Sequence, residues 1–160
     1  MRSQSPGSAV ARVRTSGFSS SRAAIAVNLT EVGGRLPFYA TSSGIVLLAF
    51  SPPDVRDRAL STTTGHRPPL ARGSIVGDLS ASIDLARRQG FAVTRGLIRP
   101  EAAAVAVPIF DSLDVPLAAL AFVVSTGDSY GGRLDGLLDL LKPAAKRIAV
   151  AVRRGQSNVS

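Results

Sequence analysis

Residues 102–124 read AAAVAVPIFDSLDVPLAALAFVV, and this stretch decides the fold. Two apolar runs of strand length flank the tetrapeptide Asp111-Ser112-Leu113-Asp114. Valine, isoleucine and phenylalanine favour strands, whereas aspartate side chains bond nearby backbone groups in turns. The stretch therefore predicts a β-hairpin. Its second arm, Leu117–Val124, is apolar on both faces, so we expect it in the middle of a sheet.

The predicted hairpin carries little side-chain volume because many of its residues are alanine. Either helices pack very close to this part of the sheet, or a space remains beside it. Close packing is the more general outcome, since native protein interiors contain few voids. The alanines concerned are Ala102, Ala103, Ala104, Ala106, Ala118, Ala119 and Ala121.

The rest of the chain supplies further strands and helices. Alternating apolar residues predict strands, and polar capping residues before apolar runs predict helix starts. The strands come in pairs with helices between and after them, which indicates an α+β domain with a largely antiparallel sheet flanked by helices. Residues 1–7 and 155–160 are predicted to be disordered, which leaves one domain over residues 8–154. Strands are expected at 9–13, 24–32 and 91–93, and helices at 44–50, from Pro53, at 78–89 and at 133–152.

Composition narrows the class of protein. The 160 residues include no Cys, which excludes a disulfide framework, a thiolate metal site and a Cys nucleophile. No apolar run reaches about 18 residues and the start has no signal-peptide core, so we expect a cytoplasmic protein without membrane contact. The net charge of +8 comes from 19 basic residues that are scattered along the chain. Such scatter is typical of a solvated surface rather than of a nucleic-acid footprint.

Residues suited to catalysis are scarce. His66 is the only histidine, and nothing in the sequence places a nucleophile or an orienting group beside it. Asp111 and Asp114 suit a turn better than an acid–base pair. The chain has no G-x-S-x-G motif, no phosphate-binding loop and no histidine pair for zinc. We therefore expect neither an enzyme nor a bound metal or cofactor.

Four segments resemble the effector-binding domain of IclR-type transcriptional regulators. Leu36–Ala49, LPFYATSSGIVLLA, is similar to the family's LPLHATALGKALLA. Gln89–Val93, QGFAV, is similar to RGYAV, and Ala104–Asp111, AVAVPIFD, is similar to CIAAPIFD. Pro116–Leu120 resembles the strand that follows in the family. The order and spacing of these segments hold over residues 24–152.

The resemblance implies a GAF-like fold, a small-molecule effector and assembly into dimers or tetramers. A sheet that lacks an edge strand would expose backbone groups that pair with another chain, which favours the same assembly. The family's winged helix-turn-helix has no counterpart in these residues, so specific DNA contact is expected only through such a domain outside them. The chain by itself is expected to bind DNA weakly. The alternative function is a non-sensing oligomerisation module that keeps the fold.

Carried over by motif, the resemblance places the effector between the sheet and the segments that cap it. Two serines usual on the family's last strand are Ala121 and Val123 here, so we expect an unusually apolar pocket. An apolar or aromatic effector with one polar end fits better than a short organic acid, because a buried carboxylate would gain few donors. The Ser42 and Ser43 hydroxyls and the N–H groups at Gly44 would hold the polar end. The effector-binding residues implied are Ile25, Ser42, Ser43, Gly44, Thr94, Ala102, Ala104, Ala121 and Val123.

Overall fold

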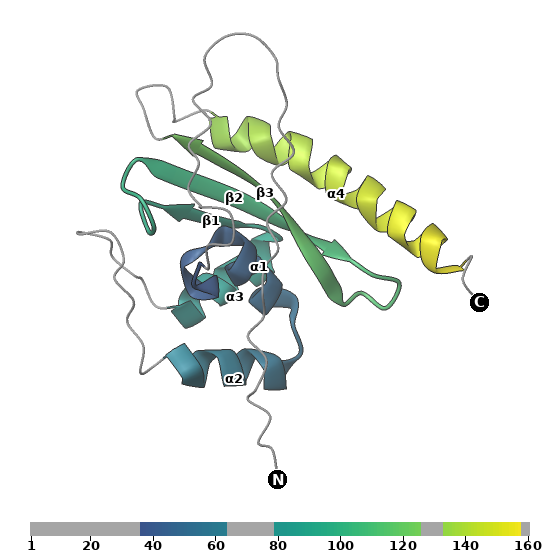
Figure 1. Cartoon of the computed structure of the whole chain (residues 1–160), viewed down its shortest axis with the longest axis horizontal. Coiled ribbons are helices and arrows are strands. Elements are labelled where there is room, and N and C mark those ends of the chain that lie inside the picture. The colour runs from purple at the N-terminus through teal and green to yellow at the C-terminus, as the bar shows by residue number, and fades with distance from the viewer. Residues whose placement is uncertain (1–35, 64–78, 126–132, 158–160) are drawn as a thin grey trace.

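The computed structural model describes residues 36–63, 79–125 and 133–157. These residues form an α+β domain, as predicted, with helices on both faces of an antiparallel sheet (Figure 1). The strands predicted at 9–13 and 24–32 and the disordered start predicted at 1–7 lie outside the described residues. The elements are the 3-10 turn η1 (Phe38–Ala40), the helices α1 (Ser42–Phe50), α2 (Pro53–Thr63), α3 (Leu79–Gln89) and α4 (Arg133–Ser157), and the strands β1 (Ala92–Arg95), β2 (Ala102–Phe110) and β3 (Pro116–Ser125).

The described sheet has the strand order β1-β2-β3, and both pairs are antiparallel. β2 and β3 form the predicted hairpin, with Val105 opposite Phe122. The expectation that Leu117–Val124 lies in the middle of the sheet is wrong for the described residues, in which β2 holds the centre and β3 an edge. None of the ten β3 residues is fully buried, whereas most of β2 is. An apolar run does not reveal how many strands pair with it.

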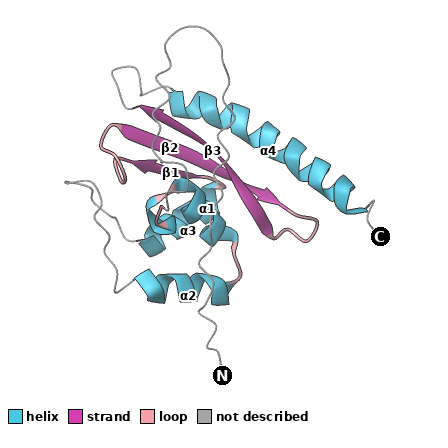
Figure 2. Ribbon diagram, in the orientation of Figure 1, coloured by secondary structure: helices cyan, strands magenta, loops and turns pink. Residues whose placement is uncertain are grey.

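Alternation along β2 divides its side chains between two cores. Successive residues of a strand point to opposite faces of the sheet. Val105 and Val107 pack with Leu141 of α4 on one face. Ala106 packs on the other face with residues of α1 and α3, among them Ile83. Figure 2 shows the same division, with α4 on one side of the sheet and α1 and α3 on the other.

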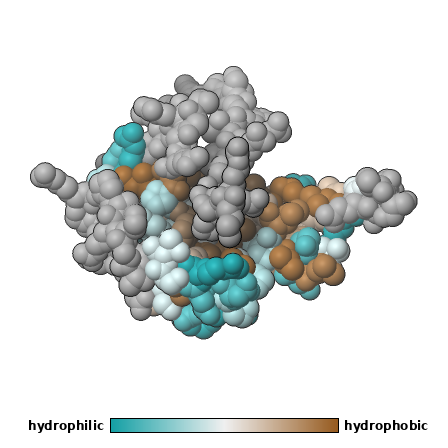
Figure 3. All heavy atoms as spheres, turned by 60° about the horizontal axis from the view of Figure 1, so that its bottom comes forward, coloured by the Kyte–Doolittle hydropathy of each residue, from teal (hydrophilic) through white to brown (hydrophobic). Residues whose placement is uncertain are grey.

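The surface differs in character from one element to the next. α2 is mostly polar and gives the hydrophilic area at the front of Figure 3, whereas the hairpin end of the sheet exposes hydrophobic groups. Leu113, Val115 and Leu117 are among the exposed apolar residues at this end. No helix in the described residues is both long enough and apolar enough to cross a membrane.

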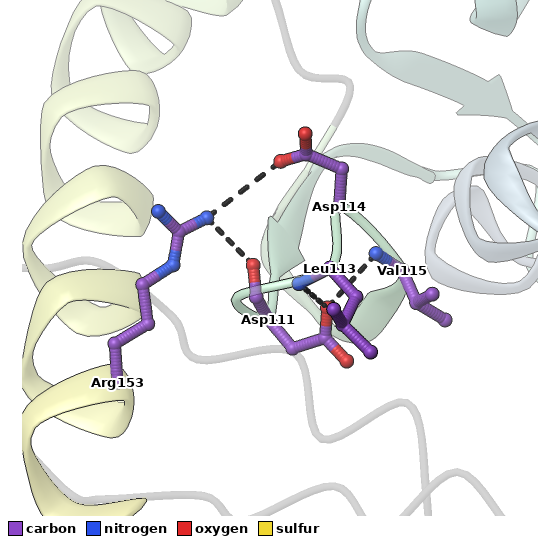
Figure 4. Close-up of polar contacts among 5 residues, drawn as sticks. All are labelled: Asp111, Leu113, Asp114, Val115 and Arg153. Carbon is purple, nitrogen blue, oxygen red and sulfur yellow. Dashed lines mark hydrogen bonds and ion pairs between the residues drawn. The ribbon is translucent and has the colours of Figure 1, made fainter. Parts of the chain in front are cut away.

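The hairpin turn is built by Asp111, as the sequence predicts. Its Oδ1 accepts hydrogen bonds from the backbone N–H groups of Leu113 (2.8 Å) and Val115 (3.0 Å) (Figure 4). Asp114 has a φ of 56°, in the left-handed region that aspartate tolerates better than most residues. The two carboxylates therefore shape a turn and do not form an acid–base pair.

Asp111→Ala is expected to lower the free energy of unfolding by about 1 kcal/mol, since two backbone donors lose their acceptor at a partly solvated site. The measurement is urea denaturation followed by circular dichroism. Ser112→Ala is the control, because Ser112 is exposed and its side chain makes no hydrogen bond within the described residues. Equal losses in the two variants would contradict the role of Asp111.

α4 is longer than the sequence suggests. Residues 155–157 were expected in a disordered tail, but the helix continues to Ser157. Arg153, near the C-terminal end of α4, contacts the hairpin turn. Its Nη2 donates to the Asp111 carbonyl oxygen (2.6 Å) and lies 3.7 Å from the Asp114 carboxylate. Gly155 is a stop signal in the sequence, because glycine commonly follows the last helical residue, yet the helix continues through it.

Candidate functional site

The start of α1 is fixed by Thr41, the first of three hydroxyl residues in the predicted capping segment. Its Oγ1 accepts a hydrogen bond from Gly44 N (3.0 Å), and its hydroxyl donates to the Phe38 carbonyl oxygen (3.0 Å). The N–H group of Gly44, predicted to hold the polar end of an effector, is therefore already paired within the chain. The nearby Ser42 and Ser43 hydroxyls make no hydrogen bond in the described structure.

Gly44 has a packing role that the sequence did not reveal. A methyl group on its Cα would overlap the Phe38 carbonyl group and lie 2.6 Å from the carbonyl carbon. The backbone of η1 thus crosses α1 at a distance that only glycine permits. This contact positions the residues before α1 against the helix start.

α1 presents one side to the sheet. Ser42, Ile45, Val46 and Ala49 are spaced as one helical face, and all four are buried. At the C-terminal end of α1, the rings of Phe50 and Phe110 lie 5.2 Å apart, edge to face. Ser42 therefore continues the buried face at the opposite end of the helix, away from the hairpin turn.

Two neighbouring rows of residues cross the sheet on the α1 side. The register places Thr94, Ala104 and Val123 opposite one another, and this set is called the Thr94 row. It also aligns Ala92, Ala106 and Ala121, called the Ala106 row.

The helices cover one of the two rows more completely than the other. The Ala106 row belongs to the core formed with α1 and α3. The Thr94 row is outside that core, with Ala104 half-buried and Val123 48% exposed. The alanines of the hairpin allowed either close packing of helices or a space beside the sheet. Helices pack closely on the Ala106 row, whereas the described helices leave the Thr94 row partly uncovered.

Two buried hydroxyls lie on this side of the sheet. Ser42 is 1% exposed and Thr94 is 8% exposed. Neither side chain has a hydrogen-bond partner in the part of the chain that the structure describes. A buried hydroxyl without a partner costs about 1–3 kcal/mol, so both groups favour a bond to another polar group.

The arginines near Thr94 in the sequence do not offer a charged donor to these hydroxyls. Arg95, adjacent to Thr94, stands opposite Ala103 and so lies on the other face of the sheet. Arg99 is 3.7 Å from Glu101, with which it forms an exposed ion pair. Burial raises the pKa of Tyr39, in the turn before α1. No charged donor for a carboxylate is therefore fixed at the Thr94 row among the described residues.

The structure brings together most of the sheet residues that the resemblance implied. Thr94, Ala104 and Val123 form one row, and Ala102 is buried on the same face beside it. Ala121 lies instead in the closed Ala106 row. Ile25 is outside the described residues, so its place in the site stays a prediction.

Other kinds of site are not found near this row. Among the described residues, no three His, Asp or Glu side chains gather as metal ligands would. A shallow surface depression lies elsewhere, on α4, and its lining consists of Lys146, Arg147, Val150, Ala151 and Arg154.

Comparison with known proteins gives a consistent result. The family described as "Bacterial transcriptional regulator IclR C-terminal" matches residues 18–150. The Pca regulon regulatory protein of Pseudomonas putida is 38% identical over 100 residues, which are 60% of this chain and 33% of that protein. The chain thus spans about a third of the length of this relative.

Solved structures of the same family share the fold. An IclR homolog from Microbacterium hydrocarbonoxydans, complexed with 4-hydroxybenzoate, is 33% identical with a TM-score of 0.62, covering 79% of this chain and 50% of that one. The C-terminal domain of the E. coli transcriptional regulator KdgR is 27% identical with a TM-score of 0.65, covering 74% of this chain and 73% of that one. Because the family match covers most of the sequence, the chain belongs to the IclR family of bacterial transcriptional regulators and corresponds to the C-terminal effector-binding domain of these proteins.

Proposed function

We propose that this domain senses an aromatic compound with one polar end, bound between the start of α1 and the Thr94 row. The observation that carries the proposal is that the Ser42 and Thr94 hydroxyls are both buried and have no partner among the described residues, with Thr94 opposite half-buried Ala104. A ring would lie on the apolar surface of Ala104 and Val123. Its hydroxyl would exchange hydrogen bonds with one or both protein hydroxyls.

Magnitudes favour such a ligand over a short acid. Burying about 150 Å² of ring surface contributes about 4 kcal/mol, and a hydrogen bond to a buried hydroxyl adds about 1 kcal/mol. A short 2-oxo acid has little apolar surface and brings a charge that no fixed cation meets here. The 4-hydroxybenzoate complex of the Microbacterium relative supports an aromatic ring in the ligand. That compound also carries a carboxylate, so in this chain a hydroxylated aromatic without a charge is expected to bind more tightly than 4-hydroxybenzoate.

A non-sensing interaction module is the second candidate. Exposed apolar side chains on β3 and α4, such as Phe122 and Leu140, favour a role in assembly. In either case we propose a homo-oligomer that acts in the cytoplasm and reaches specific DNA sites only through a winged helix-turn-helix outside these residues.

The test is thermal unfolding of the whole chain with two ligand panels, hydroxylated aromatics including 4-hydroxybenzoate and short 2-oxo acids. The proposal predicts a higher melting temperature with at least one aromatic and no change with the acids. Stabilisation by the acids alone would contradict the apolar site. Stabilisation by neither panel would favour the non-sensing module.

Thr94→Val and Ser42→Ala are expected to weaken the binding of that aromatic about fivefold to tenfold each, the effect of one lost hydrogen bond. Removing an unpartnered buried hydroxyl should leave the melting temperature of the free protein unchanged or raise it. Titration calorimetry and thermal unfolding give the two readouts, with Ser112→Ala as a surface control. A loss of stability without a loss of affinity would mean that these hydroxyls serve the fold and not the ligand.

A further inference from the structure

The outward face of α4 carries a regular stripe. Leu138, Leu141 and Ala145 face the sheet and are buried. At about 100° per residue, the positions on the opposite side recur at intervals of four and three residues, the spacing of a helix–helix seam. All six residues at these positions are exposed, and they are called the outer stripe: Gly136, Leu140, Pro143, Arg147, Val150 and Arg154.

The outer stripe has the shape of a packing surface. Leu140 is 62% exposed and Val150 is 47% exposed. The surface depression on α4 includes Arg147, Val150, Ala151 and Arg154, which have the i, i+3, i+4, i+7 spacing of a hole that accepts a side chain from a facing helix. Leu140 is a side chain of suitable size and apolar character for such a hole.

Charge is distributed unevenly along the same face. Asp135 and Asp139 precede the centre of α4, and residues 140–157 contain only basic charges. Lys142 lies over the Phe91 ring and Arg153 contacts the hairpin turn, so these two cations are engaged within the chain. Asp135, Asp139 and the basic residues Lys146, Arg147 and Arg154 have no ion-pair partner in the described ranges.

The outer stripe is also symmetric about residue 145. Its members pair as 136 with 154, 140 with 150, and 143 with 147, so the stripe is complementary to itself when reversed. A two-fold axis generates this arrangement, because each contact is then made twice. Resting on the homo-oligomer proposed above, we propose its contact: α4 pairs antiparallel with α4 of a second copy of this chain, with Leu140 of each copy against Val150 of the other.

This register also places opposite charges together. Helical side chains lean towards the N-terminus of their own helix. In the antiparallel pair, Asp139 of one copy and Arg154 of the other are separated by about 4.5 Å along the axis, and they lean towards each other. The antiparallel pair brings like charges together only near its centre, where the two Arg147 positions are about 6 Å apart along the axis. A parallel pair would set the basic halves side by side over their whole length, where like charges repel.

The sheet holds α4 in place for this contact. The Arg153 side chain donates a hydrogen bond to the Asp111 carbonyl oxygen at 2.6 Å (Figure 4). The buried face of α4 packs on β2. Neither anchor uses a residue of the outer stripe. The stripe therefore remains available along about 27 Å of helix, from Gly136 to Arg154.

Cysteine cross-linking tests the register, and the natural chain contains no Cys. The double variant Leu140→Cys/Val150→Cys is expected to form a covalent dimer on mild oxidation, because residues 140 and 150 of different copies would be within disulfide reach. Each single variant is the matched control, since its two cysteines would be about 15 Å apart along the axis. Equal cross-linking of a single variant, or none of the double variant, would overturn the proposal.

Mass in solution gives an independent readout. The wild-type chain is expected to be dimeric at about 50 μM by light scattering, and the Leu140→Asp variant is expected to be monomeric. The control variant Leu85→Asp changes an exposed leucine of α3 and should remain dimeric. Asp139→Arg should weaken the dimer about tenfold, and Asp139→Arg/Arg154→Asp should restore it. A monomeric wild-type chain, or a dimer indifferent to Leu140→Asp, would show that α4 does not make the contact.

Discussion

Gly44→Ala is expected to lower the melting temperature by about 10 °C or to prevent folding. The added methyl group would overlap the Phe38 carbonyl group, a backbone group that cannot rotate away as a flexible side chain can. Relief requires η1 to separate from α1 and the Thr41 cap to break, since Thr41 bonds both Phe38 and Gly44. Together these losses amount to about 3–5 kcal/mol, a cost typical of overlap at a close backbone contact plus loss of a cap.

The measurement is thermal unfolding of purified protein, with Gly155→Ala as the matched control. Gly155 lies in α4, and a methyl group there meets nothing within 4 Å. Alanine favours helix over glycine by about 1 kcal/mol, so this variant should be slightly more stable than the wild-type chain. If Gly44→Ala were as stable as Gly155→Ala, η1 would have to move freely, and the close contact would have no structural role.

Local signals in the sequence predicted much of this fold. The Asp111 turn, the hydroxyl cap before α1 and the Pro53 start of α2 each depend on bonds within a few residues, and all three are found. The position of β3 at an edge of the described sheet depends on which strands meet across the sheet, and an apolar run carries no such information. The extension of α4 to Ser157 is supported by the Arg153–Asp111 contact, 42 residues apart in sequence.

The residues of the candidate site were also predicted only as far as local sequence signals allow. The motif resemblance selected Thr94, Ala104 and Val123, and the register places them in one row. The resemblance also selected Gly44, but its N–H group is paired with Thr41 and its Cα packs on the Phe38 backbone. Only tertiary packing separates Ala104 from Ala106, because both are alanines on the same face of β2. The sequence therefore indicated the right face of the sheet without showing where the helices leave it uncovered.

Ala104→Leu and Ala106→Leu, identical substitutions two residues apart, are expected to have opposite effects. Ala106 is fully buried in the core with α1 and α3, so three added carbon atoms would overpack it and cost about 3 kcal/mol. Ala104 is half-buried and outside that core, so its variant should keep nearly the wild-type melting temperature. The larger side chain would instead occupy the proposed ring site.

Binding measured by calorimetry should separate the two variants as clearly as stability does. For the aromatic compound that stabilises the wild-type chain, Ala104→Leu should lower affinity by about 100-fold or more, since loss of most ring burial removes about 3 kcal/mol. Ala104→Ser is the size-matched control and should retain binding, because it adds one small polar atom and no bulk. If Ala104→Leu bound the compound normally, the ring could not lie on the Thr94 row. If it unfolded as Ala106→Leu is expected to, the helices would close on both rows and leave no room for an effector there.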